Sequence, residues 1–171
     1  MSRVQVLKLL LLGIGILALD MLSKGLVHFY FNPLEHAPHF FPFGGISVFQ
    51  AGGIDFCIHH VTNRGVAWGL GDSLHSWILA IRIAIIGALG LYLGLSSKAV
   101  SQRYGILLVI AGGIGNVIDY FMYGHVIDML HFIFWGYSYP VFNVADASIF
   151  CGIVLLFLQS WIKKKDAIPT N

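Results

Sequence analysis

The sequence predicts an all-α membrane protein with four transmembrane helices and a small β-hairpin in one of the longer connecting segments. Its 171 residues are 57% hydrophobic and only 11% charged, against about 45–50% and 25% in soluble domains. Four segments have the roughly 20 mostly apolar residues that a spanning helix needs. Lys and Arg gather in short segments outside these four. This composition excludes a soluble globular protein, a disordered chain and a disulfide scaffold, and a net charge of +2 does not suggest nucleic acid.

The expected spans cover residues 4–27, 76–95, 104–119 and 144–162. The first starts like a secretory signal, but no A-x-A cleavage site follows, and the helical pattern continues through Asp20 and Lys24. We therefore expect an uncleaved first span. Arg82 interrupts the second span and should snorkel outward or pair with an acid. The third span holds three glycines that permit close helix packing, Gly112, Gly113 and Gly115.

The distribution of basic residues predicts the orientation of these spans. Seven of the ten lie before or at the start of the first span, between the second and third, or after the fourth: Arg3, Lys8, Lys98, Arg103, Lys163, Lys164 and Lys165. Since short cytoplasmic loops carry the excess of Lys and Arg, both termini should be cytoplasmic. Residues 28–75 and 120–143 should then lie outside, and residues 1–171 should form a single membrane domain.

The two outer segments have different characters. Residues 46–50 and 54–61 are strand-like runs around Ala51-Gly52-Gly53, which predicts a hairpin. Residues 28–45 contain three of the five prolines and suit an irregular interfacial stretch. Residues 120–143 hold nine of the 24 aromatic residues, as chain at a membrane–water boundary does.

Most of the polar residues that are costly in or near a bilayer fall at one depth, near the outer face. They are Asp20, Lys24, Asn63, Asn116, Asp119, Asp128, Asn143 and Asp146. Ionisable groups within spans usually face a bundle interior or a water-filled cavity. Unrelated structural residues would scatter over several depths, so this clustering predicts a shared site.

Several of these residues also have a purely structural interpretation. Asn143 followed by Asp146 has the pattern of an N-cap with an acid at N3. Asp20 and Lys24 are four residues apart and would neutralise each other on one helix face. Asp119, near the end of a helix, opposes the helix dipole and should have a partner.

The motifs of several enzyme classes are absent. The chain has neither the H-E-x-x-H of metalloproteases nor a G-x-S-x-G elbow. His125, Asp128 and His131 share a helix face only loosely, and Cys57 and Cys151 fit no metal or redox spacing. We therefore expect neither a metal nor another cofactor.

A pair of acids remains. Asp128 lies among apolar residues in GHVIDMLHF, and Asp146 begins the fourth span. Two carboxyls a few Å apart share a proton, so one can accept a proton from water while the other donates to a carbonyl oxygen. Asp128 and Asp146 are thus candidates for metal-free hydrolysis of a peptide bond.

At this point the sequence resembles the lipoprotein signal peptidases, or signal peptidase II, over nearly its whole length. Five motifs carry the resemblance in order. They are Asp20-Met21-Leu22-Ser23-Lys24 (D-x-x-x-K), Asn63-Arg64-Gly65-Val66-Ala67-Trp68 (N-x-G-x-A-F/W), Gly112 to Asp119 (G-G-x-x-G-N-x-x-D), Gly124 to Asp128 (G-x-V-x-D) and Phe142 to Asp146 (F-N-x-A-D).

The resemblance implies an intramembrane aspartyl endopeptidase that removes bacterial prolipoprotein signal peptides by cutting before the diacylglyceryl-modified cysteine. It implies that Asp128 and Asp146 are catalytic. By motif position, the residues that line or support the site are Asn63, Gly65, Asn116 and Asn143, braced by Asp20, Lys24 and Asp119. The implied fold has four transmembrane helices, an extracytoplasmic β-cradle and a short interfacial helix.

The resemblance also implies a multi-pass protein of the bacterial cytoplasmic (inner) membrane, with its active site near the outer face. The implied partners are lipidated prolipoproteins, membrane lipids and globomycin-type inhibitors, and we expect a monomer. Two positions depart from the family pattern. Tyr120 replaces a usual arginine, which puts that charge contact in doubt, and Met129 replaces a usual phenylalanine.

Two other functions stay open on the residues alone. Intramembrane acids also form proton relays, so a small proton-coupled transporter is the main alternative. Against it, the chain has no internal repeat and no acid deep in the cytoplasmic half of a span. A non-enzymatic assembly factor that binds lipid or peptide is the other alternative, and it predicts that Asp128→Asn retains full function.

Overall fold

A computed structural model describes residues 2–65, 72–95 and 100–166, and its main elements are four long helices. They are α1 (Arg3–Tyr30), α2 (Asp72–Leu95), α3 (Val100–Tyr123) and α4 (Val144–Asp166). Each is long and apolar enough to cross a membrane. Their outward faces leave large apolar side chains exposed, such as Leu22 on α1, Leu91 on α2 and Phe157 on α4. These faces suit a lipid environment, and the four expected apolar helices are confirmed.

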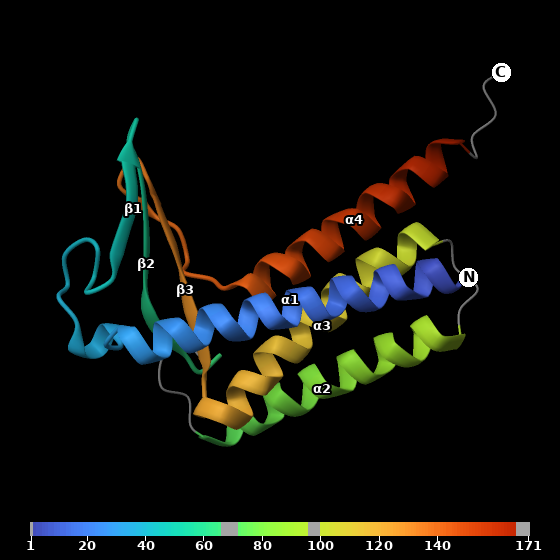
Figure 1. Ribbon diagram of the computed structural model, residues 1–171, viewed down its shortest axis with the longest axis horizontal. Helices are drawn as coiled ribbons and strands as arrows, with labels where there is room; N and C mark the ends of the chain where they lie inside the picture. Colours follow the sequence, from blue (N-terminus) through green and yellow to red (C-terminus); the bar gives the residue numbers. More distant parts are fainter. Residues whose placement is uncertain (1, 66–71, 96–99, 167–171) are drawn as a thin grey trace.

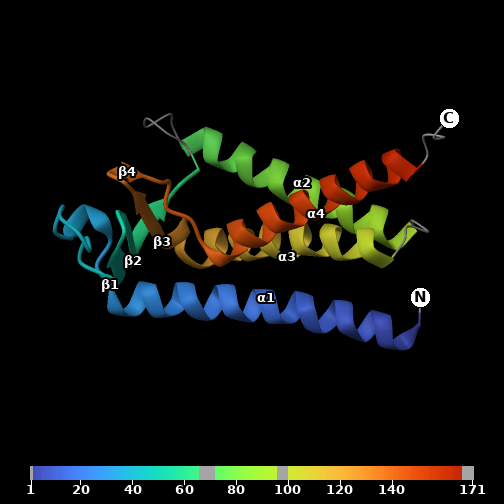
Figure 2. The same cartoon turned by 90° about the horizontal axis from the view of Figure 1, so that it is seen from above.

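Helix α3 is the centre of the bundle, because it packs against each of the other three helices. Seen from above, α1 and α2 lie on opposite sides of α3 and α4 (Figure 2). Gly112 of α3 faces the backbone carbonyl of Ala145 on α4, where no Cβ would fit. Gly105 of α3 and Gly152 of α4 also lack room for a Cβ. Small residues therefore let α3 and α4 approach closely, as the three glycines of the third span predict.

A small antiparallel sheet lies at one end of the helices (Figure 1). Its strands, in order, are β1 (Ile46–Ala51), β2 (Ile54–Asn63), β3 (Val126–Phe134) and β4 (Tyr137–Ser138). The predicted hairpin is confirmed: β1 and β2 pair across Gly52 and Gly53, which both have positive φ as a two-residue turn requires. The sequence analysis did not predict β3 and β4, which it treated as interfacial chain. A one-turn 3-10 helix, Leu34–His36, lies between α1 and the hairpin.

Strand β2 contains a bulge that changes which of its side chains face Asp128. Ile58 pairs with Leu130, but Val61 pairs with Asp128, so two residues of β2 lie opposite Met129 alone. Because a one-residue insertion reverses the alternation of faces, Val61 and Asn63 share the face of Asp128 beyond the bulge. Asn63 thereby comes within reach of Asp128.

The sheet is joined to the helices by a small apolar core. Val27 of α1 packs with Ile127 and Met129 of β3, and all three side chains are buried. Met129 is packed in this core, so the core accommodates methionine at the position where the motif usually has phenylalanine.

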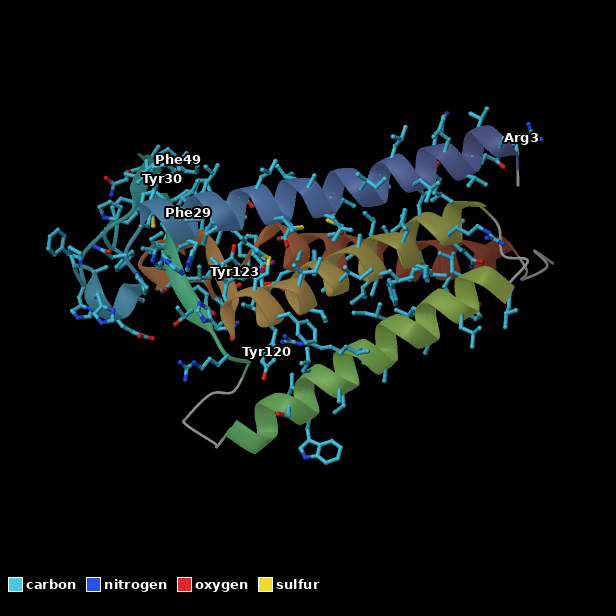
Figure 3. All side chains as sticks on the ribbon, turned by 60° about the horizontal axis from the view of Figure 1, so that its bottom comes forward. Arg3, Phe29, Tyr30, Phe49, Tyr120 and Tyr123 are labelled. Carbon is cyan, nitrogen blue, oxygen red and sulfur yellow. The ribbon has the colours of Figure 1, made fainter. Side chains whose placement is uncertain are left out.

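The two ends of the helix bundle differ in chemistry. Figure 3 shows Phe29, Tyr30, Phe49 and Tyr123 near the sheet, whereas Arg3 lies at the far end of α1. Tyr and Trp favour membrane–water interfaces, and basic residues favour cytoplasmic ends. The labelled aromatic side chains and Arg3 thus lie at opposite ends of the bundle.

Candidate active site

Asp128 is buried on β3, where its carboxylate accepts hydrogen bonds from two asparagines. Asn63 Nδ2 donates to Oδ2 at 2.8 Å and Asn143 Nδ2 donates to Oδ1 at 2.7 Å. Only 2% of the Asp128 surface is exposed. Burial is the main reason why the pKa of Asp128 is raised to about 6; the Asn63 and Asn143 hydrogen bonds and the Lys24 charge oppose the rise, and the nearby Asp146 carboxylate adds to it. A carboxyl with this pKa can hold or release a proton near neutral pH.

Asp146 lies in the first turn of α4 and is less buried than Asp128. Asn116 Nδ2, from α3, donates to Asp146 Oδ1 at 2.8 Å. The Asp146 backbone N–H donates to Asn143 Oδ1 at 2.8 Å. Asn143 therefore caps α4 as its sequence pattern predicts, and the same side chain also contacts Asp128.

The two acids are joined by a short chain of amides. Asn143 Nδ2 lies 3.2 Å from Asn116 Oδ1, so a continuous path of hydrogen bonds runs from Asp128 through both asparagines to Asp146. Both asparagines are buried. Their amides fix the carboxyl orientations, and the charge of Asp146 acts on Asp128. This arrangement brings together the two acids that the sequence analysis selected.

Three buried charged side chains, Asp20, Lys24 and Asp119, lie next to this path of hydrogen bonds. Lys24 Nζ is 2.7 Å from Asp20 Oδ2, 2.7 Å from Asp119 Oδ2 and 3.0 Å from Asn116 Oδ1. All three protons of the ammonium thus have acceptors. Asp119 has the partner that its position was expected to require, and the expected Asp20–Lys24 pair is present.

Asp20 and Asp119 also accept hydrogen bonds from backbone N–H groups of the site. Asp20 Oδ1 accepts from the Ala145 N–H at 2.8 Å, and Asp119 Oδ2 accepts from the Ile127 N–H at 3.2 Å. Ala145 precedes Asp146, and Ile127 precedes Asp128. The charged group therefore positions the backbone next to each candidate catalytic acid.

Gly65 of the predicted site and Gly115 of the third motif have clear structural roles. A Cβ at Gly115 would lie only 2.5 Å from Asp20 Oδ2, so a side chain there would displace that carboxylate. Gly65 has a φ of +74° and its N–H donates to Asn63 Oδ1 at 2.8 Å, which orients the Asn63 amide. Gly65 also lies beside the guanidinium of Arg82.

An apolar cavity of about 450 Å³ opens beside Asp146. Its walls include four phenylalanines from β3, α4 and the segment between them, Phe132, Phe134, Phe142 and Phe150. The sequence analysis did not select these residues. The period-two spacing of Phe132 and Phe134 was the available signal, because it is typical of one face of a strand.

The remaining predicted features are not among the contacts described above. Val66, Ala67 and Trp68 of the second motif lie outside the described residues. Tyr120 packs edge-on against Phe121. Among the described residues, one group of three side chains could share a metal ion, and it contains neither Asp128 nor Asp146.

Comparison with known sequences identifies one family. The family model described as signal peptidase (SPase) II matches residues 12–162. A lipoprotein signal peptidase of Chlamydia felis is 36% identical over 119 residues, covering 68% of this chain and 72% of that protein. One from Bacillus pumilus is 34% identical over 113 residues, with 64% and 72% covered. One from Anoxybacillus flavithermus is 35% identical over 106 residues, covering 60% of this chain and 62% of that protein's length.

Two solved structures have the same fold. Each is of a bacterial membrane enzyme obtained by the in meso method. The first, at 2.3 Å resolution, has a TM-score of 0.76 and 22% identity, with 96% of this chain and 93% of that chain covered. The second, at 1.9 Å, has a TM-score of 0.74 and 24% identity, with 89% and 91% covered. The arrangement of four helices and a small sheet is therefore common to all three chains.

Proposed function

Because this chain belongs to the signal peptidase II family, we propose that it is an aspartyl endopeptidase that removes signal peptides from bacterial prolipoproteins. The cut falls immediately before the diacylglyceryl-modified cysteine. The observation that carries this proposal is the pairing of Asp128 and Asp146 through Asn143 and Asn116, in a setting that raises the pKa of Asp128 to about 6.

The proposed chemistry uses the two acids with one shared proton. The ionised carboxyl takes a proton from a water molecule, and the resulting hydroxide attacks the carbonyl carbon of the scissile peptide. The protonated carboxyl donates its proton to the carbonyl oxygen. In the second half, the carboxyl that took the proton from water gives it to the leaving nitrogen, and the C–N bond breaks. Either acid can begin as the proton donor, because the reaction needs one protonated and one ionised carboxyl.

The other polar residues orient this pair. Asn63, held by the Gly65 N–H, and Asn143 direct the Asp128 carboxyl, while Asn116 directs that of Asp146. Asp20, Lys24 and Asp119 brace the backbone on either side.

The surroundings suit a substrate that is partly lipid. The cavity beside Asp146 is lined by phenylalanines and would hold an apolar part of the substrate next to the acids. The aromatic end of the bundle supports an outward-facing site, and the basic end supports cytoplasmic termini in the inner membrane (Figure 3). An acid pair near the outer face of the membrane can be reached by water while the acyl chains of the substrate stay in the bilayer.

A cleavage assay tests the proposal directly. Wild type, Asp128→Asn and Asp146→Asn are purified in detergent and given a prolipoprotein that carries a diacylglyceryl cysteine. We expect wild type alone to cut before the cysteine, with globomycin inhibiting it. Each variant should lose several orders of magnitude in kcat/KM, because either change removes a carboxyl from the pair.

Two controls separate the possible outcomes. Thermal unfolding of each variant establishes that it is folded, and the same substrate without the lipid tests the role of the acyl chains. Cleavage by all three proteins would retain a peptidase but reject these acids. No cleavage by folded wild type would reject the peptidase function.

A further inference from the structure

A second cluster of chemically active side chains lies on the sheet, away from the two acids. Cys57 and His59 are two residues apart on β2, and His131 of β3 lies opposite Cys57. One ligand atom from each of the three residues lies within 4.8 Å of the others. His59 Nε2 is 3.1 Å from His131 Nδ1. The two strands thus bring one sulfur and two ring nitrogens to a single point.

The cluster is enclosed rather than exposed to solvent. Cys57, His59 and His131 are exposed by 0%, 1% and 5%. The ring of Phe43 covers both histidines, with centroid distances of 5.1 Å and 5.2 Å. The backbone around Gly45 also closes on His59, because a Cβ there would lie 2.7 Å from His59 Cβ.

The polar groups of this cluster are only partly satisfied. The histidines share one hydrogen bond with each other, and His131 Nε2 pairs with Ser138 Oγ at 2.8 Å. His59 Nδ1 is buried and has no hydrogen-bond partner among the described residues. Buried polar atoms are nearly always paired, so this enclosed cluster keeps hydrogen-bonding capacity that its own side chains do not use.

We propose that Cys57, His59 and His131 form a binding site for a divalent metal ion of the zinc type. Cysteine sulfur and histidine nitrogen are both zinc ligands in proteins, and three protein ligands leave a fourth position for water or another donor. Two nitrogens bound to a tetrahedral zinc lie roughly 3.3 Å apart, close to the 3.1 Å found here. Ser138 would orient the His131 ring as an outer hydrogen-bond partner.

The protonation states of the free site are compatible with this proposal. Burial lowers the pKa of His59 to about 4 and also lowers that of His131, so both rings are neutral and have a free lone pair at pH 7. Burial, with the Asp55 charge, raises the pKa of Cys57 to about 11. Binding therefore has to release the thiol proton, as it does at other thiolate sites.

A metal here would fasten two strands that serve the candidate active site. Cys57 precedes the β2 bulge, His59 lies in it and Asn63 follows it, while Asp128 lies three residues before His131. The ion would fix the register of β2 against β3 without touching either acid. This site is separate from the proposed peptidase chemistry, and metal binding can be measured whether or not the protein cleaves a substrate.

The test measures metal binding in detergent, on protein without a histidine tag. The probes are Zn²⁺, measured as bound metal per chain, and Co²⁺, whose thiolate charge-transfer absorption reports a Co–S bond. The variants are Cys57→Ser, His131→Gln and Ser138→Ala. The controls are Cys151→Ser, which leaves Cys57 as the only thiol, and His36→Gln, which alters a histidine outside the group.

We expect one Zn²⁺ per chain, with the Co²⁺ band present in wild type and both controls. Cys57→Ser should abolish the band, and His131→Gln should weaken Zn²⁺ binding beyond the roughly 10–100-fold expected when an outer partner such as Ser138 is lost. If Cys57→Ser fails to fold, the Cys151→Ser protein decides alone, because a band there can come only from Cys57. No stoichiometric Zn²⁺ in folded wild type, or loss of the band in Cys151→Ser, would overturn the proposal.

Discussion

Asp128 and Asn63 show how single hydrogen bonds can set the acid–base range of the proposed reaction. Burial raises the pKa of Asp128, and the hydrogen bond from Asn63 partly opposes that rise because it stabilises the ionised carboxyl. If the pair works with one shared proton, activity is lost as rising pH removes that proton. The alkaline limb of kcat/KM should therefore lie near pH 6 or above, well above the usual aspartate pKa.

Asn63→Ala is the corresponding test. Without the Asn63 hydrogen bond the pKa of Asp128 rises, so the alkaline limb should move upward by roughly 0.5–1 pH unit. The measurement is a pH profile of kcat/KM. Thr62→Val is a matched control, because Thr62 bonds to Glu35 and not to an acid of the site. A limb that stays in place, or moves down, would contradict the assignment of that limb to Asp128.

At the scale of single residues, Asn143 has one role that the sequence predicted, that of a helix N-cap, and further contacts that it did not predict. Its role as N-cap of α4 follows from local spacing and is confirmed by the hydrogen bond from the Asp146 N–H. Its contacts with Asp128 and Asn116 join residues 15 and 27 positions away. Such contacts depend on tertiary packing, for which a local pattern contains no information.

Among the elements, the sheet contains one part that the sequence predicted, the β1–β2 hairpin, and two that it did not, strand β3 and the β2 bulge. The β1–β2 hairpin has a strong local signal, two strand-like runs joined at Gly52-Gly53. Strand β3 has no such signal, because both of its faces are largely buried near Asp128 and its residues are apolar without clear alternation. The β2 bulge, which aligns Asn63 with Asp128, is fixed by pairing with β3 and is invisible in β2 alone.

The contact between α3 and α4 gives a prediction at this scale. A Cβ in Gly112→Ala would meet the Ala145 carbonyl and approach Ile149 Cγ1 to 2.8 Å. Since backbone cannot rotate away as a side chain can, the start of α4 should shift and Asp146 with it. We expect a loss of about 1–3 kcal/mol in the free energy of unfolding and a marked fall in kcat.

Gly90→Ala on α2 is the matched control, because a Cβ there has no neighbour within 4 Å. Thermal unfolding and cleavage rates of both variants are compared in the same detergent. Equal behaviour of the two variants would show that the close approach at Gly112 is not needed to hold Asp146.

At the scale of the whole molecule, Lys24 joins three helices and the sheet. Its two carboxylate partners come from α1 and α3, and these accept from backbone N–H groups of α4 and β3. The sequence predicted that these polar residues cluster at one depth, because depth follows from position along a span. Which acid pairs with which base depends on how the helices are rotated, so only the intrahelical Asp20–Lys24 pair was predictable.

Lys24→Met should be among the most destabilising single changes. It leaves two buried carboxylates without a cation, which typically costs about 3–5 kcal/mol. The triple variant Asp20→Asn, Lys24→Met, Asp119→Asn should be more stable than Lys24→Met alone, since amides still accept from the same N–H groups without carrying charge. Thermal unfolding of the two variants checks this order, and the reverse order would contradict it.

The position of Lys24 also bears on how the chain is made. Asp20 and Lys24 pair within one helix, so this part of α1 can enter the bilayer with its two charges neutralised while the rest of the chain is still on the ribosome. Asp119 has no basic residue one turn away on α3, and its cation arrives from α1. Insertion of α3 would therefore be helped by an α1 that is already in place, which makes synthesis from the N-terminus the favourable order of assembly.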